Sequence, residues 1–175
     1  MTMTLIETKT LGTAAASIAF TSIPQTYTDL LVLVSSRGND GSTNGAILVS
    51  FNGDNQLSNG STRWLQGSGS AASSSSASFA VSGITSANAT TADTFGSGQF
   101  YICNYTSTSS KSISQDWVSE NNATQAFQRI TAGLSTLAAA ITSITLYIDS
   151  QSFMAGTTVS IYGILKGSSG GVTVS

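Results

Sequence analysis

The sequence predicts an all-β chain, and three observations favour a β-sandwich or barrel. Apolar and polar residues alternate in several short segments, which is typical of half-buried strands. Turn sequences rich in Gly, Asn and Ser separate these segments. More than six such segments follow one another at short spacing. At 175 residues the chain fits one domain.

The first half of the chain contains three expected strands. A short strand begins at Ile18 and ends before Pro24, which has no amide hydrogen to donate to a sheet. The continuous apolar run 30–34 suits a central strand covered on both faces. The alternating segment 47–51 leads into Asn52-Gly53-Asp54, a turn sequence because Asn and Gly tolerate positive φ.

The second half contains four further segments of alternating or apolar character, around residues 100–105, 113–117, 144–148 and 159–165. In the clearest of them, Ile144, Leu146 and Ile148 share one face. We expect the last two of these strands to form a hairpin or to be neighbours. The segment 123–141 has helical spacing, but its Thr, Ser and Gly residues are poor helix formers. We therefore predict a strand through Phe127 and Ile130 followed by a loop.

Two segments are expected to lack regular structure of their own. The stretch 67–78 consists of Gly, Ser and Ala and cannot by itself bury enough apolar surface to offset its ordering entropy. A mobile loop is predicted there, unless a neighbouring segment orders it. The predicted organisation is one β-sandwich domain over residues 1–166 and a flexible C-terminal tail or arm over 167–175. Such an arm could add a strand to another subunit.

Composition argues against several classes of protein. Charged residues make up only 8% of the chain, against about 25% in an average soluble domain. The six Lys and Arg residues occur singly, so no nucleic-acid surface is expected. Cys103 is the only cysteine and excludes an internal disulfide. No signal peptide and no membrane-spanning segment are expected, which predicts synthesis in the cytoplasm.

No catalytic or cofactor-binding residue is predicted. The chain has no histidine, which removes the usual general base and the Ser-His-Asp arrangement. Asp116 and Glu120 are the closest carboxylates in sequence, but on a strand they would lie about 13 Å apart, too far for shared catalysis. The turns at 40–44 and 52–55 are rich in oxygen ligands but lack EF-hand spacing, so no metal is expected. We predict a protein that is not an enzyme.

Five aromatic residues are candidate contacts for glycans or for other subunits. Residues that alternate on strands must in part point outward, and aromatic rings can stack on sugars or fill subunit contacts. The five candidates are Trp64, Tyr101, Tyr105, Tyr147 and Tyr162.

Several motifs resemble those of a family of small structural proteins from tailed bacteriophages. The resemblance spans most of the chain and rests on residues 5–8, 22–30, 51–54, 118–124, 132–134, 141–146 and 161–164. These segments read LIET, SIPQTYTDL, FNGD, VSENNAT, AGL, ITSITL and IYGI. The resemblance implies an antiparallel β-sandwich of jelly-roll type and a place in the virion, associated with the head or the tail.

The resemblance and the composition together predict a capsid decoration (cement) protein. Such a protein binds the major capsid protein or other virion proteins in many copies and stabilises the assembled head. We expect a homo-oligomer, for which a trimer at a symmetry axis is one arrangement. The alternative is a tail or fibre module that binds host-surface glycans through the five aromatic residues.

Overall fold

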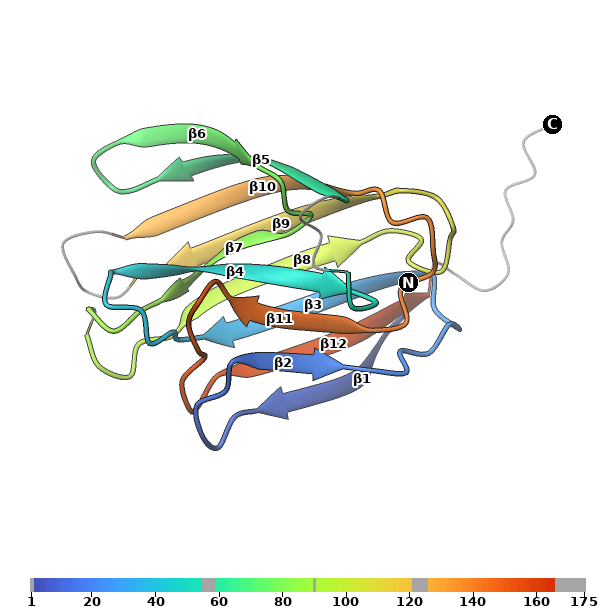
Figure 1. Cartoon of the computed structure of the whole chain (residues 1–175), viewed down its shortest axis with the longest axis horizontal. Helices are drawn as coiled ribbons and strands as arrows, with labels where there is room; N and C mark the ends of the chain where they lie inside the picture. Colours follow the sequence, from blue (N-terminus) through green and yellow to red (C-terminus); the bar gives the residue numbers. More distant parts are fainter. Residues whose placement is uncertain (1, 55–58, 90, 121–125, 166–175) are drawn as a thin grey trace.

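The computed structural model describes residues 2–54, 59–89, 91–120 and 126–165. These residues form twelve strands in two sheets, and all strand pairs are antiparallel. The two sheets pack face to face as a β-sandwich (Figure 1). The predicted fold class is confirmed.

One sheet has eight strands and the other has four. The large sheet runs in the order β1 (Thr2–Thr10), β12 (Thr158–Leu165), β3 (Asp29–Ser36), β8 (Gly96–Ile102), β9 (Lys111–Ser119), β10 (Phe127–Ser135), β5 (Gly60–Gly67) and β6 (Ala72–Ala77). The small sheet runs in the order β2 (Ser17–Phe20), β11 (Ile144–Ile148), β4 (Asn44–Phe51) and β7 (Ser82–Ser86).

Eight of the strands have the order of a jelly roll. Strands β1, β12, β3 and β8 form one layer, and β2, β11, β4 and β7 form the other. Two inserted hairpins extend the first layer: β9–β10 lies between β8 and β11 in sequence, and β5–β6 lies between β4 and β7. In Figure 1 this extension carries β5 and β6 beyond the edge of the small sheet.

The core lies between the two sheets and follows the predicted alternation. Leu30 and Val32 of β3 are fully buried, and so are Ile144 and Leu146 of β11. Burying a large aliphatic side chain of this kind contributes roughly 1.5–3 kcal/mol. Phe127, the first residue of β10, also joins the core. The predicted strand from Phe127 through Ile130 is therefore confirmed.

A tryptophan fixes the distance between the two sheets where the extension begins. The Trp117 side chain of β9 is fully buried. It occupies the space over Gly98 of β8 and Gly83 of β7, where an added Cβ would approach the indole ring within 1.9 Å and 2.6 Å. Because neither glycine has a side chain, the ring fits between one strand of each sheet.

The turn predicted after β4 is confirmed, and its first residue also connects two loops. Asn52 and Gly53 have φ values of 54° and 79°, the left-handed conformation that this turn requires. The Asn52 side-chain oxygen accepts hydrogen bonds from the amides of Thr142 (2.8 Å) and Ser143 (3.1 Å). The turn is thereby tied to the segment that precedes β11.

Two predictions about the strands are wrong. Strands β11 and β12 are not neighbours but lie in different sheets, because the segment between them crosses the sandwich. Strand β3 is covered on one face only, so Leu31 and Leu33 are half-buried on the other. Within 67–78 a neighbour does order the chain: residues Ala72–Ala77 form strand β6 through hydrogen bonds to β5. The predicted tail, 167–175, lies outside the described residues.

Candidate interaction surface

Among the residues that the structure describes, none outside the large sheet covers one of its two faces. We call this side, opposite the small sheet, the outer face. The register gives a continuous row of outward-pointing side chains across all eight strands: Thr8, Ser160, Leu33, Gln99, Asp116, Ile130, Leu65 and Ser74. Seven inter-strand spacings of about 4.8 Å make this row about 34 Å wide.

Exposed apolar side chains are concentrated on the outer face. Leu65 and Ile130 are cross-strand partners on β5 and β10, and they are 65% and 60% exposed. Leu134 lies four residues from Ile130 on the same side of β10. Met3 and Leu5 of β1 are exposed at the opposite end of the sheet. We call Leu65, Ile130 and Leu134 the apolar patch.

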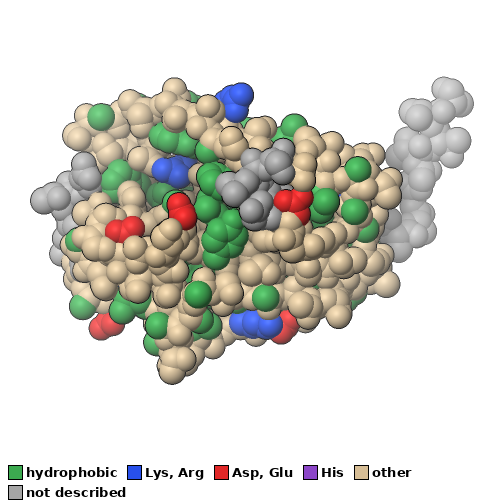
Figure 2. All heavy atoms as spheres, viewed as in Figure 1, with side chains coloured by type: hydrophobic (Ala, Val, Ile, Leu, Met, Phe, Trp, Pro, Cys, Tyr) green, Lys and Arg blue, Asp and Glu red, His purple; other side chains and the backbone are tan. Residues whose placement is uncertain are grey.

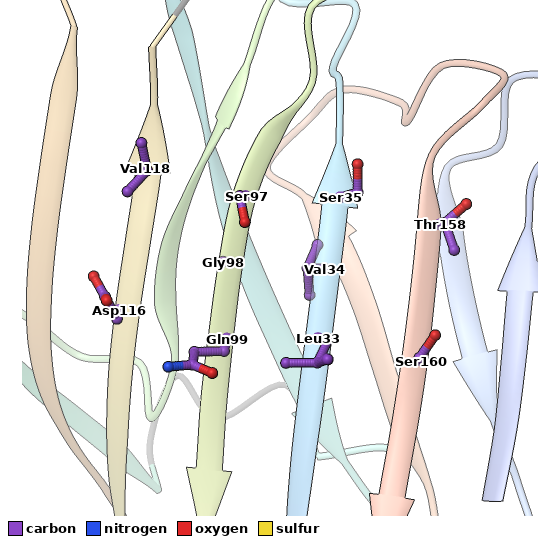
Figure 3. Close-up of a pocket in the computed structure, with 10 residues that line it drawn as sticks. All are labelled: Leu33, Val34, Ser35, Ser97, Gly98, Gln99, Asp116, Val118, Thr158 and Ser160. Atoms are coloured by element: carbon purple, nitrogen blue, oxygen red, sulfur yellow. The ribbon is translucent and has the colours of Figure 1, made fainter. Parts of the chain in front are cut away.

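A shallow hollow of about 410 Å³ crosses the middle of the outer face. Figure 3 shows its lining residues on four neighbouring strands. The polar groups on it are hydroxyls, one amide and one carboxylate, from Ser35, Ser97, Gln99, Asp116, Thr158 and Ser160. The Asp116 carboxylate accepts a hydrogen bond from the Gln128 amide at 2.7 Å. The hollow can therefore form many hydrogen bonds but carries little charge.

Further hollows lie on the extension of the same sheet. One of about 540 Å³ borders the apolar patch at Leu65 and Ile130 and reaches Ser74 and Ser76 of β6. Another, of about 250 Å³, is lined by Leu65, Ile130 and Gln128. The outer face is thus an uneven surface that combines apolar side chains with hydroxyls, the composition found at protein interfaces of moderate polarity.

Two of the five predicted aromatic residues share the outer face. Tyr162 of β12 and Tyr101 of β8 flank Leu31 in one cross-strand row. The Tyr101 hydroxyl donates a hydrogen bond to the Asp29 carboxylate, which also accepts the amide of Asn104 at 2.8 Å. Burial raises the pKa of Tyr101, and the bond to Asp29 raises this pKa further. The ring of Tyr101 is therefore held in place.

Trp64 lies on the other side of β5, so it does not share a surface with these tyrosines. The Arg129 guanidinium stacks over the Trp64 ring at 4.6 Å, a cation–π contact. Arg129 donates to the Gln66 side-chain oxygen from Nε (2.9 Å) and from Nη2 (2.6 Å). Burial lowers the pKa of Arg129 to about 10, so the guanidinium remains charged at neutral pH.

The remaining two aromatic candidates are elsewhere. Tyr147 is half-buried on the exposed side of the small sheet, and burial raises its pKa. Tyr105 lies in a turn, not on a strand, and is fully buried. Its hydroxyl donates to the Pro24 carbonyl. The prediction that Tyr105 is a surface contact is wrong, because β8 ends at Ile102 and the turn directs the ring into the core.

The sequence did not single out the apolar patch. Leu65 and Ile130 are far apart in sequence, and each occurs in a segment with little regular apolar alternation. The signal that locates them is the register of β5 against β10, which pairs the two residues directly. Register depends on which strands become neighbours, and a single sequence does not specify that.

Charges and ligand clusters are sparse in the described part of the chain. On the side seen in Figure 2, acidic and basic side chains occur in ones and twos among uncharged atoms. Within the described ranges, no group of three or more Cys, Asp or Glu residues could hold a metal ion. Among the same residues there is no helix of the length and hydrophobicity needed to cross a membrane.

The fold and the surface define an antiparallel jelly-roll sandwich with one extended, uncovered sheet face. No protein-family model and no curated protein matches the sequence.

Proposed function

We propose that the chain is a structural protein of a bacteriophage virion, a capsid decoration protein that binds the assembled head through its outer face. The observation that carries this proposal is the gathering of exposed apolar side chains and shallow hollows on the one uncovered face of the large sheet. Jelly rolls occur in viral capsid and lectin domains, so the fold agrees with the proposal.

The outer face is large enough for a stable interface. A sheet about 34 Å wide with strands of six to nine residues presents roughly 900 Å², similar to the roughly 800 Å² that one partner contributes to a standard interface. The apolar patch would supply most of the binding energy, and the hydroxyls around it would match polar atoms of the shell. Little charge would need to be desolvated.

The proposed mechanism is mass action. A protein that binds the assembled shell, and not its separated subunits, shifts the equilibrium towards the shell. Each site contributes about 2.7 kcal/mol when the free protein is at 100 times its Kd. The resemblance to small structural proteins of tailed phages supports a phage head as this shell.

A direct test mixes the purified protein with phage capsids that lack it. Wild-type protein should saturate the capsids at a fixed stoichiometry and raise their melting temperature. The double variant Leu65→Ser/Ile130→Ser should bind at least about tenfold more weakly, because it removes two exposed anchors. Leu165→Ser is the matched control, since Leu165 is also exposed but alternates to the other side of its strand.

The second candidate, a module that binds host glycans, is favoured by the row Tyr162–Leu31–Tyr101 beside the polar hollow. It predicts binding of host polysaccharide that weakens in Tyr162→Ala and not in Leu65→Ser/Ile130→Ser. Absence of capsid binding together with saturable polysaccharide binding would replace the first proposal by the second.

A further inference from the structure

Strand β6 forms one edge of the large sheet, and no strand of the described ranges lies beside its outer edge. Its sequence, Ala-Ser-Ser-Ser-Ser-Ala, contains no charge and no proline. Its register with β5 runs from Thr62↔Ala77 to Gly67↔Ala72 without a bulge. Soluble proteins usually protect an edge strand with charges, proline or a bulge, because unpaired amides and carbonyls attract other strands.

The other sheet edges are protected in these ways. Strand β1, at the far end of the large sheet, has a bulge between Leu5 and Glu7 and carries the ion pair Glu7–Lys9 at 3.4 Å. The Lys9 ammonium also donates to the Ala19 carbonyl of β2, the edge of the small sheet. The bulge, the ion pair and the Lys9 hydrogen bond thus protect β1 and β2. Strand β6 has no bulge and no charged side chain.

Side chains and a neighbouring segment cover β7, the last edge. The Gln115 side-chain oxygen accepts the Ser82 amide at 3.1 Å. The Gly38 amide donates to the Ser86 carbonyl at 2.7 Å. All five residues of β7 are buried. Strand β6 is thus the one unprotected edge among the strands that the structure describes.

The β5–β6 hairpin extends beyond the small sheet but is anchored at its base. After β6, the Ala80 carbonyl accepts the Gln115 side-chain amide at 2.9 Å. The same carbonyl lies so close to Gly133 that an added Cβ would approach it within 2.0 Å. The chain that follows β6 is therefore fixed at Ala80. The first five residues of β6 are nevertheless exposed on the sheet.

We propose that two copies of this chain pair through β6, antiparallel across a twofold axis, to form one continuous sixteen-stranded sheet. The interaction is isologous, because the same strand of each copy supplies the backbone donors and acceptors. Facing residues in an antiparallel pair lie on the same side of the sheet. The twofold axis therefore passes beside either Ser74 or Ser75, each opposite its own counterpart.

The chemistry of β6 selects a second copy as the occupant. In both registers, every residue of β6 that faces the other copy is either Ser or Ala. No like charges and no bulky side chains therefore meet. A twofold axis perpendicular to the sheet keeps both outer faces on one side. The apolar patches of the two copies then lie on either side of the β6–β6 contact and form parts of one continuous surface.

Pairing of β6 with β1 of another copy is the alternative, and it would propagate into an open fibre. The bulge and the charges of β1 oppose that arrangement. Pairing of six residues buries less than the roughly 1,200 Å² of a standard interface, so the isolated dimer should be concentration-dependent. Display on a repetitive surface would strengthen it through effective concentration. The inference does not require the proposed function, because it concerns the protein in solution.

The first test is the molar mass of the purified full chain, measured by sedimentation equilibrium over a range of concentrations. We expect a reversible change from the 17.8 kDa monomer to a species of twice that mass. Ser75→Lys should raise the dimer dissociation constant by roughly tenfold or more, because like charges then face each other near the axis. Thr4→Lys, on the exposed edge strand β1, is the matched control and should leave it unchanged.

The second test identifies the contact. In a Cys103→Ser background, Ser74→Cys or Ser75→Cys should form a disulfide-linked dimer on mild oxidation, because facing residues lie about 4.5–5.5 Å apart between Cα atoms. Thr4→Cys should not. A wild-type monomer at all concentrations, a trimer, or cross-linking no faster than in Thr4→Cys overturns the proposal. Neither test uses capsids, so failure here leaves the decoration proposal standing.

Discussion

Trp117 faces Gly98 directly across neighbouring strands, and a side chain at position 98 would approach the indole ring within 1.9 Å. The pair lies at the point where the jelly roll passes into its four-stranded extension. Strand β9 is thereby packed under β7 as well as hydrogen-bonded to β8. The interaction surface on the extension depends on this packing, because β10, β5 and β6 continue from β9.

We predict that Gly98→Ala lowers the free energy of unfolding by about 1–3 kcal/mol, the range for overpacked cores. The added methyl group has no space unless the Trp117 ring or the strand moves. Urea unfolding followed by tryptophan fluorescence measures the change. Gly12→Ala is the control, since no atom lies within 4 Å of its added Cβ. Equal midpoints for the two variants would contradict the packing described.

Lys111 is a buried cation that holds two loops together. Its ammonium donates to the carbonyls of Ser107, Ser109 and Ala139 at 2.8 Å and of Leu137 at 3.3 Å. We predict that Lys111→Met lowers the free energy of unfolding by about 1–3 kcal/mol, because four partly buried carbonyls lose a charged donor. Amide exchange in both loops should increase. Unchanged exchange would show that the loops do not depend on this ammonium.

Alkaline pH should destabilise the protein. Burial raises the pKa of Tyr101, Tyr105 and Tyr147 above the ordinary value of 10. Above pH 10 the unfolded chain therefore releases protons that the folded chain retains, and stability falls as pH rises. Lys111 has the opposite effect below pH 10.5. Burial lowers its pKa, so the unfolded chain binds a proton there that the folded chain has released, and stability rises with pH.

The variant Tyr101→Phe tests this dependence. Above pH 10 the free energy of unfolding of the variant should decrease less steeply with pH than that of the wild type. The difference in slope should be less than about 1.4 kcal/mol per pH unit, because a single titrating group is removed and this group is partly exposed to solvent. Urea unfolding at a series of pH values from neutral to alkaline provides the slopes. The idea fails if wild type and variant lose stability in parallel throughout that range.

The apolar patch should contribute to binding and not to folding. We predict that Leu65→Ser/Ile130→Ser changes the free energy of unfolding by no more than about 1 kcal/mol, since both side chains are largely exposed. Retention on a hydrophobic-interaction column should fall in the same variant. A much larger loss of stability would show that the two residues support the fold.

The sequence by itself determined the class of the fold and most of its strands. Alternation located Ile144, Leu146 and Ile148 on one buried face, because the side-chain period of a strand is fixed by backbone geometry. The turn at Asn52-Gly53 was equally predictable, since Asn and Gly adopt its positive φ values more readily than other residues. Both features depend only on residues that are close together in the sequence, so they could be predicted without the structure.

Tertiary structure alone decided which strands are neighbours, and with that the surface. The pairing of Leu65 with Ile130, the separation of β11 from β12 and the ordering of β6 all depend on contacts between residues distant in sequence. The same holds for Tyr105, whose ring turns inward where a turn interrupts alternation. Local propensity sets the face on which a side chain lies, whereas register and sheet order set what lies beside it.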